Sequence, residues 1–266
     1  LFSPWDLPRF LSLAILGTYY QNSGGKDKMK YPNIRAGTFL ARPNRFVAQV
    51  EVEGNLQVCH VKNTGRCREL LVPGCRVYLV DSHNPVRKTR FDLVAVEKEG
   101  PAGPLLINMD SQAPNRVFGE WAAAGGLGFV PTLLRPEMTY GNSRIDYYWE
   151  FLNGGEKTFD STRGFVEVKG VTLEEDRIAR FPDAPTLRGV KHLEALVAAR
   201  QAGYGAAVCF VVQMEGMRWM EPNDATHPAF GEALRRAARA GVEVIALECG
   251  VTPDTLRILR PIPVKL

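Results

Sequence analysis

The stretch that decides the fold of the second half of the chain is Gly164–Val171, which reads GFVEVKGV. Its apolar and β-branched residues indicate a strand. Side chains alternate between the two faces of a strand, so Glu167 and Lys169 share one face and Val168 points into the core on the other. A Glu-x-Lys triplet in a strand is common, and most such pairs lie on solvated faces. The triplet needs a partner to indicate chemistry.

That partner is Asp146, in the segment Ser143-Arg144-Ile145-Asp146 that opens a second candidate strand, 144–151. If a turn around Asn153–Gly155 joins the two strands, Asp146 lies beside Glu167. Two carboxylates so placed make an oxygen site that suits Mg²⁺ or Mn²⁺. Such an ion polarises a phosphodiester and lowers the pKa of a bound water. Lys169 would orient that water and offset the charge that develops on phosphate.

Two further groups belong to this hypothesis. Glu137, in Arg135-Pro136-Glu137, could supply a third carboxylate if its segment packs beside the sheet. Lys191 and His192 lie on the amphipathic helix predicted over 186–202. This places them near the carboxyl end of the strand pair, where they could contact a phosphate. His192 could equally be a packed, hydrogen-bonded histidine, and Lys191 a solvated lysine.

The elements around these residues predict an α/β layer with a mixed or parallel central sheet. Helices are expected over 112–123, 186–202 and 228–240, and strands over 206–213 and 242–248. Thr186 is placed to cap its helix, and Gly203 to end it. The preceding loop, Phe181–Thr186, carries Asp183, which together with Arg188 could form an ion pair or reach the site.

The first half of the chain reads as a small barrel. Candidate strands are 45–53, 56–61, 76–81, 90–96 and 105–109, with one or two helical turns over 66–71. Gly54-Asn55 between the first two is a hairpin signal. Five short strands and a small helical piece favour an OB-like barrel, with a small sandwich or an SH3-like barrel as the rival folds.

Basic residues of this barrel are candidates for phosphate contacts. Asn63, Arg66 and Arg68 follow a strand and could grip phosphate or a base edge, or could form a structural turn with exposed charges. Arg42 and Arg45 are further candidates, with Phe46 as a stacking ring or a core residue.

The composition of the chain limits the classes of protein to which it can belong. The chain has 266 residues, a formal net charge of +4 and a pI near 8.8, which is compatible with a polyanionic partner. Five cysteines without a CxxC pair argue against a disulfide framework or a structural zinc and favour a reducing, cytoplasmic location. No apolar run reaches the length of a membrane span. Residues 1–34 look like an extension, with an artefact of the start site as the alternative, a short helix expected around 8–19 and no assigned chemistry.

Several motifs together resemble the bacterial sugar fermentation stimulation protein family over residues 37–266. They are Asn63-Thr64-Gly65, Ser143–Asp146, Glu167-Val168-Lys169 with Val171-Thr172-Leu173, the loop Phe181-Pro182-Asp183-Ala184 with Thr186, Arg188, Gly189, His192 and Leu193, and Pro263-Val264. The resemblance implies an OB-like barrel before a domain similar to the PD-(D/E)xK nucleases, and DNA binding linked to sugar use. It implies that Asp146 is the acidic residue of the first strand motif, that Glu167 and Lys169 are the (D/E)xK pair, and that Glu137 is the additional acidic position.

We therefore expect an α/β chain, α+β overall: an extension (1–34), an OB-like five-stranded barrel (35–111) and a PD-(D/E)xK restriction-endonuclease-like domain (112–266). The predicted function is a Mg²⁺- or Mn²⁺-dependent nuclease. Its catalytic residues are Asp146, Glu167, Lys169 and Glu137, of which the three carboxylates hold the metal. The expected partner is nucleic acid, with DNA favoured over RNA. The residues expected to bind it are Asn63, Arg66, Arg68, Arg42, Arg45, Arg188, Lys191 and His192. The alternative is a non-catalytic DNA-binding regulator of sugar metabolism on a nuclease scaffold. A sugar enzyme has no supporting motif, and a homodimer is left open.

Overall fold

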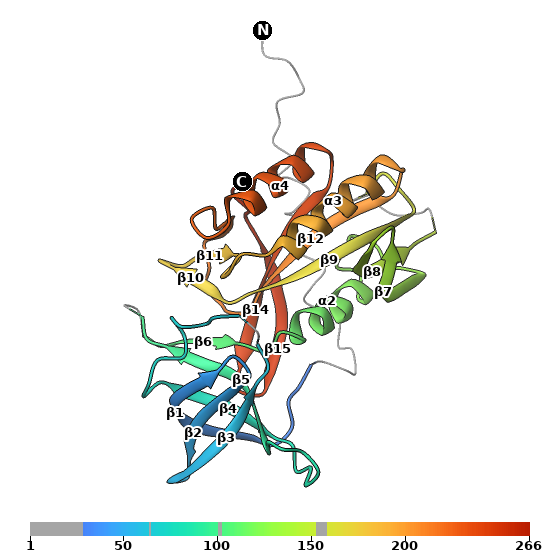
Figure 1. Ribbon diagram of the computed structural model, residues 1–266. Coiled ribbons are helices and arrows are strands. Elements are labelled where there is room, and N and C mark those ends of the chain that lie inside the picture. The colour runs from blue at the N-terminus through green and yellow to red at the C-terminus, as the bar shows by residue number, and fades with distance from the viewer. Residues whose placement is uncertain (1–28, 64, 101–102, 153–158) are drawn as a thin grey trace.

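The structure is a computed structural model that describes residues 29–63, 65–100, 103–152 and 159–266 (Figure 1). The helix expected around 8–19 and the turn expected at Asn153–Gly155 lie outside these residues. The described chain forms a β-barrel and a larger domain of helices packed on a mixed sheet.

The barrel closes through five strands, as an OB-like fold requires. The strands are β1 (Ile34–Asn44), β2 (Val47–Val52), β3 (Asn55–Val61), β4 (Arg76–Asp81) and β5 (Phe91–Lys98). Their order is β3-β2-β1-β4-β5, and parallel pairing of β3 with β5 closes the ring. Closure leaves no free sheet edge within the ring. The five-stranded OB-like barrel is thus confirmed, and the rival sandwich is wrong.

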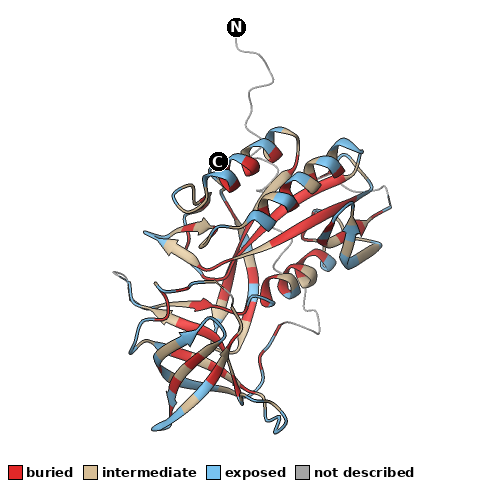
Figure 2. Cartoon of the chain, viewed as in Figure 1, coloured by how far each residue is buried: buried red, intermediate tan, exposed pale blue. Residues whose placement is uncertain are grey.

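The membership of the ring differs from the expectation by one strand. β1 was not predicted, and β6 (Leu105–Asn108), which was counted as the fifth strand, pairs only with β5 outside the ring. The piece 66–71 forms a single hydrogen-bonded turn, in which the Leu71 backbone N–H donates to the Cys67 carbonyl at 3.0 Å. Inside the barrel, alternate residues such as Ala48 and Val50 of β2 are fully buried (Figure 2).

The second domain is built on a six-stranded sheet of order β15-β14-β12-β9-β8-β7. Its strands are β7 (Leu133–Tyr140), β8 (Ser143–Glu150), β9 (Arg163–Val171), β12 (Gly205–Val212), β14 (Glu243–Thr252) and β15 (Thr255–Ile262). β9, β12 and β14 run parallel, and the outer strands run antiparallel. The mixed sheet is therefore confirmed. β7 and β15, at its two edges, were not predicted.

Helices cover both faces of this sheet (Figure 1). α3 (Leu187–Gln201) and α4 (Pro228–Arg239) share one core with Phe165 and Val208, and α2 (Ala113–Ala123) packs against Val166 and Val168 on the opposite face. Every residue of β12 is buried, because helices lie on both sides of it. As predicted, the Thr186 hydroxyl caps α3 by accepting from the Gly189 backbone N–H at 3.0 Å.

A small third sheet completes the fold. It has the order β10-β11-β13, formed by Leu173–Glu175, Ile178–Phe181 and Trp219–Pro222. None of these short strands was predicted. The sheet holds the start of the loop between β11 and α3, which carries Asp183 toward the barrel.

Candidate metal and phosphodiester site

The register of β8 and β9 brings Asp146 to Glu167. Tyr147 pairs with Val166, so the next residue on each strand, Asp146 and Glu167, comes together where the strands begin to part. Asp146 Oδ2 accepts from the Val168 backbone N–H at 2.8 Å. The adjacency expected from the sequence is therefore present.

Glu167 is the most enclosed group of the site, with 2% of its surface exposed. Its Oε1 atom receives both the Lys169 ammonium and the His192 ring nitrogen Nδ1. Its Oε2 atom is buried and has no hydrogen-bond partner among the described residues. A buried carboxylate oxygen without a partner is costly, so this atom is where a cation would bring the greatest relief.

The two carboxylates differ in their electrostatic surroundings. Burial and the negative charge of Glu167 raise the pKa of Asp146. Burial also opposes the ionisation of Glu167, but the hydrogen bond from His192 and the charge of Lys169 outweigh burial and hold the pKa of Glu167 below its ordinary range. The site therefore holds one firmly ionised carboxylate and one whose charge is under-compensated, as at sites that bind a cation.

Asn115 on α2 is a member of the site that the sequence did not indicate. Its side-chain Nδ2 donates to Asp146 Oδ1 at 3.1 Å, and its carbonyl accepts from the Tyr147 hydroxyl at 2.9 Å. It lies far from Asp146 in the sequence and belongs to no motif, so no local signal pointed to it.

His192 is the packed, hydrogen-bonded histidine of the two alternatives. It is 5% exposed and bonds Glu167, and Arg188 Nε donates to its other ring nitrogen at 3.3 Å. Arg188 and Lys191 are exposed on the surface of α3. His192 therefore acts on Glu167, and Arg188 and Lys191 are left as the candidate phosphate contacts of this helix.

Glu137 does not join the other two carboxylates. It is exposed on the edge strand β7 with a positive φ of 55°, and its ion-pair partner is Arg144 at 3.7 Å. In the part of the chain that the structure describes, no three His, Cys, Asp or Glu side chains are grouped to hold a metal. The structure thus assembles Asp146 and Glu167 but not the predicted set of three.

The barrel cations fall into two groups. Arg42 donates to the backbone carbonyls of Arg66, Arg45 and Asn63, so it braces the turn after β3 and is not free for phosphate. The side chains of Arg66 and Arg68 are exposed and have no partner among the described residues. The guanidinium of Arg45 lies 4.8 Å from the centre of the Phe46 ring, which is 45% exposed, so Phe46 is not a core residue.

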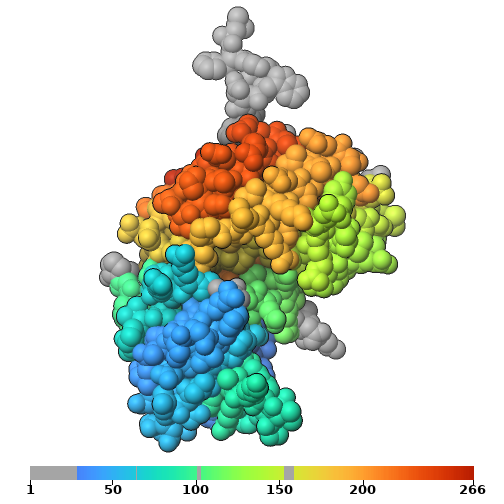
Figure 3. All heavy atoms as spheres, in the orientation of Figure 1, coloured from blue at the N-terminus to red at the C-terminus, as the bar shows by residue number. Residues whose placement is uncertain are grey.

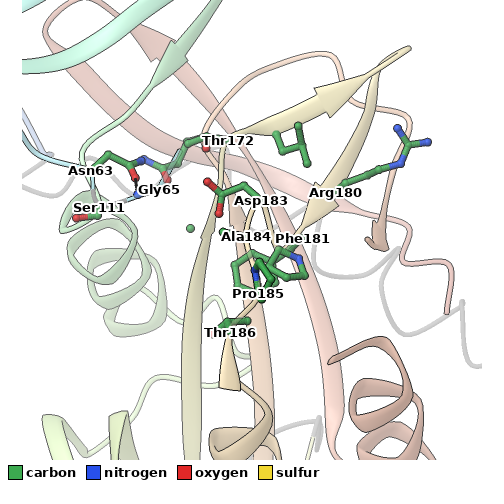
Figure 4. Close-up of a pocket in the computed structure, with 14 residues that line it drawn as sticks. Asn63, Gly65, Ser111, Thr172, Arg180, Phe181, Asp183, Ala184, Pro185 and Thr186 are labelled. Atoms are coloured by element: carbon green, nitrogen blue, oxygen red, sulfur yellow. Dashed lines mark hydrogen bonds between the residues drawn. The ribbon is translucent and has the colours of Figure 1, made fainter. Parts of the chain in front are cut away.

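A cavity of about 330 Å³ lies between the barrel and the second domain. Figure 3 shows the molecular surface hollowed between the blue-to-cyan barrel and the yellow and orange second domain. Its walls are Asn63 and Gly65 of the barrel, Gly170 and Thr172 at the end of β9, and the loop of Asp183 (Figure 4). Gly170 directly follows Lys169, so the cavity adjoins the acidic site.

An OB-like barrel joined to a restriction-endonuclease-like domain, with Asp146, Glu167 and Lys169 gathered at the parting of two strands, defines the structural class. Within it, the chain belongs to the sugar fermentation stimulation protein family. Residues 40–103 match the family model "SfsA N-terminal OB domain", and residues 112–255 match "Sugar fermentation stimulation protein RE domain".

Relatives support this assignment along most of the chain. A sugar fermentation stimulation protein homologue of Desulfitobacterium hafniense (strain Y51) is 51% identical and covers 90% of this chain and 99% of its own length. A homologue from Ruminiclostridium cellulolyticum is 48% identical over 90% of this chain and 100% of its own length. The solved structure of Pyrococcus furiosus SfsA in complex with Ca²⁺ superposes with a TM-score of 0.76 at 25% identity, covering 91% of this chain and all of that one.

Two expectations from composition can be compared with the structure. All five cysteines are free, in agreement with the absence of a disulfide framework. Among the described residues, no helix combines the length and apolarity needed to cross a bilayer.

Proposed function

We propose that the protein is a divalent-metal-dependent nuclease that cuts DNA in preference to RNA. The observation that carries the proposal is the buried, partnerless Oε2 atom of Glu167. The other oxygen of this carboxylate binds the Lys169 ammonium, and the charge of Glu167 acts on Asp146 on the neighbouring strand. Most buried side-chain polar atoms in proteins have at least one hydrogen-bond partner. A carboxylate that leaves one oxygen free beside a second acid fits a cation site.

The residues present fit Mg²⁺ or Mn²⁺. Asp146 and Glu167 would hold the ion, together with the carbonyl of Val168, and water would fill the remaining positions, as is usual for Mg²⁺. When bound, the ion supplies a water of lowered pKa and polarises the phosphodiester. The relative from Pyrococcus furiosus was solved in complex with Ca²⁺, a hard cation with the same preference for oxygen ligands.

The chain's own residues provide the rest. Lys169 is half-buried and its ammonium contacts Glu167, where it can orient the attacking water and offset charge on the phosphate. Asn115 and the Val168 N–H fix the Asp146 carboxylate from two directions. The exposed Arg66 and Arg68 of the barrel, with Arg188 and Lys191 of α3, supply positive charge for a nucleic-acid backbone.

The test is cleavage of labelled single- and double-stranded DNA and RNA in Mg²⁺, Mn²⁺, Ca²⁺ or EDTA. Asp146→Asn and Lys169→Ala should each reduce Mg²⁺-dependent cutting by orders of magnitude. Lys30→Ala is the matched control, because Lys30 is exposed and its ion pair with Asp254 is at the surface. Calorimetric titration with Mn²⁺ should show loss of binding in Asp146→Asn and retention in Lys169→Ala.

The alternative, a DNA-binding regulator without catalysis, has a different signature. It predicts tight binding of oligonucleotides that does not depend on metal, with no cutting under any of these conditions. That result would overturn the proposed function, and so would Lys169→Ala cutting as fast as the wild type.

A further inference from the structure

The cavity between the barrel and the second domain contains polar groups that no residue of the protein satisfies. The Asp183 carboxylate has no hydrogen bond or ion pair among the described residues and points into the space between Gly65 and Thr172 (Figure 4). Thr172 and Ser111 line the same cavity, and their hydroxyls have no hydrogen-bond partner within the described chain. Unpaired polar groups that line one cavity are typical of a small-ligand binding site.

Glycine at position 65 allows the Asp183 carboxylate to lie close to the barrel. A Cβ atom at this residue would collide with Asp183 Oδ2 and lie 2.8 Å from Asn63 Oδ1. The Gly65 backbone N–H instead donates to Asn63 Oδ1 at 2.7 Å, which leaves the Asn63 amide Nδ2 as a free donor. Asp183 therefore stands as an acceptor flanked by amide and hydroxyl donors.

The charge of the cavity excludes a phosphate. Among the described residues that line it, the one cation is Arg180, which is already bound to Glu221 at 2.9 Å and Glu175 at 2.6 Å. The free charged group is the carboxylate of Asp183, which repels an anion. A ligand that binds here must therefore present hydrogen-bond donors or positive charge to Asp183.

Among the nucleobases, guanine matches this arrangement. Its Watson–Crick edge places two N–H donors, N1–H and the N2 amine, side by side, with the O6 acceptor next to them. Adenine and cytosine each offer one amine beside a ring nitrogen that accepts, and thymine and uracil offer one N–H between two carbonyls. A base removed from its stack is commonly read on this edge between apolar walls. Phe181, Pro182 and Pro185 supply such walls.

We propose that this cavity binds an unpaired guanine, with Asp183 accepting from N1–H and the N2 amine. The inference rests on the proposed function, because the cavity adjoins the acidic site through Gly170 and would hold a base of the strand being bound. Its size of about 330 Å³ falls at the lower end of the range for small-ligand pockets, roughly 300–1,000 Å³.

The test is fluorescence anisotropy with the full chain in EDTA, which separates binding from cutting. The probes are oligothymidines that carry one central dG, dA, dC or deoxyinosine, and 5′-GMP and 5′-AMP serve as free nucleotides. We expect the dG probe to bind at least about fivefold more tightly than the others, the low end of what a two-bond base contact gives. Deoxyinosine, which lacks the N2 amine, should lose most of this preference.

Asp183→Asn should abolish the dG preference without unfolding the chain, since Asp183 has no partner in the described structure. Gly65→Ala should weaken dG binding, because the added Cβ atom would displace the Asp183 carboxylate. Glu194→Gln removes the same charge from an exposed position on α3 and should keep the preference.

Each result separates the two proposals. Equal binding of all oligonucleotides, or a dG preference that survives Asp183→Asn, overturns the guanine site and leaves the nuclease intact. Binding of 5′-GMP that depends on Asp183, with no oligonucleotide bound at all, supports the guanine chemistry of the cavity and overturns the proposed function.

Discussion

His192 on α3 and Glu167 on β9 are joined by a hydrogen bond between Nδ1 and Oε1, and both side chains are almost completely buried. This contact, with that of Lys169 to the same oxygen, fixes the carboxylate so that Oε2 alone is left over. Arg188 bonds the second ring nitrogen and so orients the imidazole. His192 is thus a positioning residue whose effect reaches the proposed metal only through Glu167.

Replacement of His192 by alanine should therefore weaken Mn²⁺ binding and cutting by about 10- to 100-fold, the usual range for a group that orients a metal ligand. His192→Asn, which retains a donor, should recover part of the loss. Calorimetric titration with Mn²⁺ measures the first effect, and Glu194→Ala on the same helix is the control. Unchanged Mn²⁺ affinity in His192→Ala would show that the contact is only structural.

Asp146 gives a prediction about stability and pH. Its pKa is raised by burial and by the charge of Glu167, so between the unfolded and folded pKa values the folded state binds more protons than the unfolded state. Stability from this group is consequently lost as the pH rises through that window. The difference in melting temperature between Asp146→Asn and the metal-free wild type should therefore shift in favour of Asp146→Asn as the pH rises from 4 toward neutral. A difference that stays the same at every pH would contradict this.

The acidic site could be predicted from the sequence because its core is local. Alternation within β9 places Glu167 and Lys169 on one face, and one antiparallel pairing brings in Asp146. Asn115 could not be predicted, because its contact depends on how α2 docks on the sheet. Glu137 is assigned to the site by the family resemblance, but the positive φ at this residue and its pairing with Arg144 hold it at the exposed edge.

The sequence predicts the strands and helices whose buried residues recur at a regular spacing. Elements without such a pattern could not be predicted from it. In β1 only Phe39 is buried, so the segment lacks the apolar alternation of a strand although it pairs with both β2 and β4. β7 and β15 are edge strands with Pro136 and Pro261, which argue against a strand in sequence reasoning. Edge positions tolerate proline because one side of such a strand needs no hydrogen-bonding partner.

The ion pair between Asp81 and Arg90 in the barrel should stabilise the fold at neutral pH and lose this effect in acid. The fully buried carboxylate of Asp81 is held by Arg90 at 2.5 Å and 2.9 Å. The bonds from Arg90 lower its pKa from 3.8 to about 2. The stabilisation is therefore complete above pH 4 and is lost as the pH falls toward 2.

The measurement is the melting temperature of wild type and Asp81→Asn against pH. We expect Asp81→Asn to melt lower at pH 7 and the difference to shrink between pH 4 and 2. The exposed substitution Glu232→Gln is the control and should shift neither curve. A difference that does not change with pH would mean that charge is not what Asp81 contributes.

Asp110 connects the barrel to the second domain. Its carboxylate accepts from Lys62 Nζ at 2.7 Å at the end of β3 and from the Tyr31 hydroxyl at 3.2 Å, and its carbonyl accepts from Gln213 Nε2 at 3.1 Å at the end of β12. Asp110→Ala leaves a half-buried ammonium and a buried hydroxyl without their acceptor. We expect a loss of about 3–5 kcal/mol in the free energy of unfolding, measured in urea.

Asp110→Asn retains an acceptor and should lose less, whereas Glu232→Ala, which removes a carboxylate from an exposed pair, should cost about 0–1 kcal/mol. Because Asp110 ties the two domains together, calorimetry should show that the two domains unfold less cooperatively in Asp110→Ala than in the wild type. An Asp110→Ala protein that unfolds as cooperatively as the wild type, with stability within about 1 kcal/mol of wild type, would show that other contacts hold the domains together.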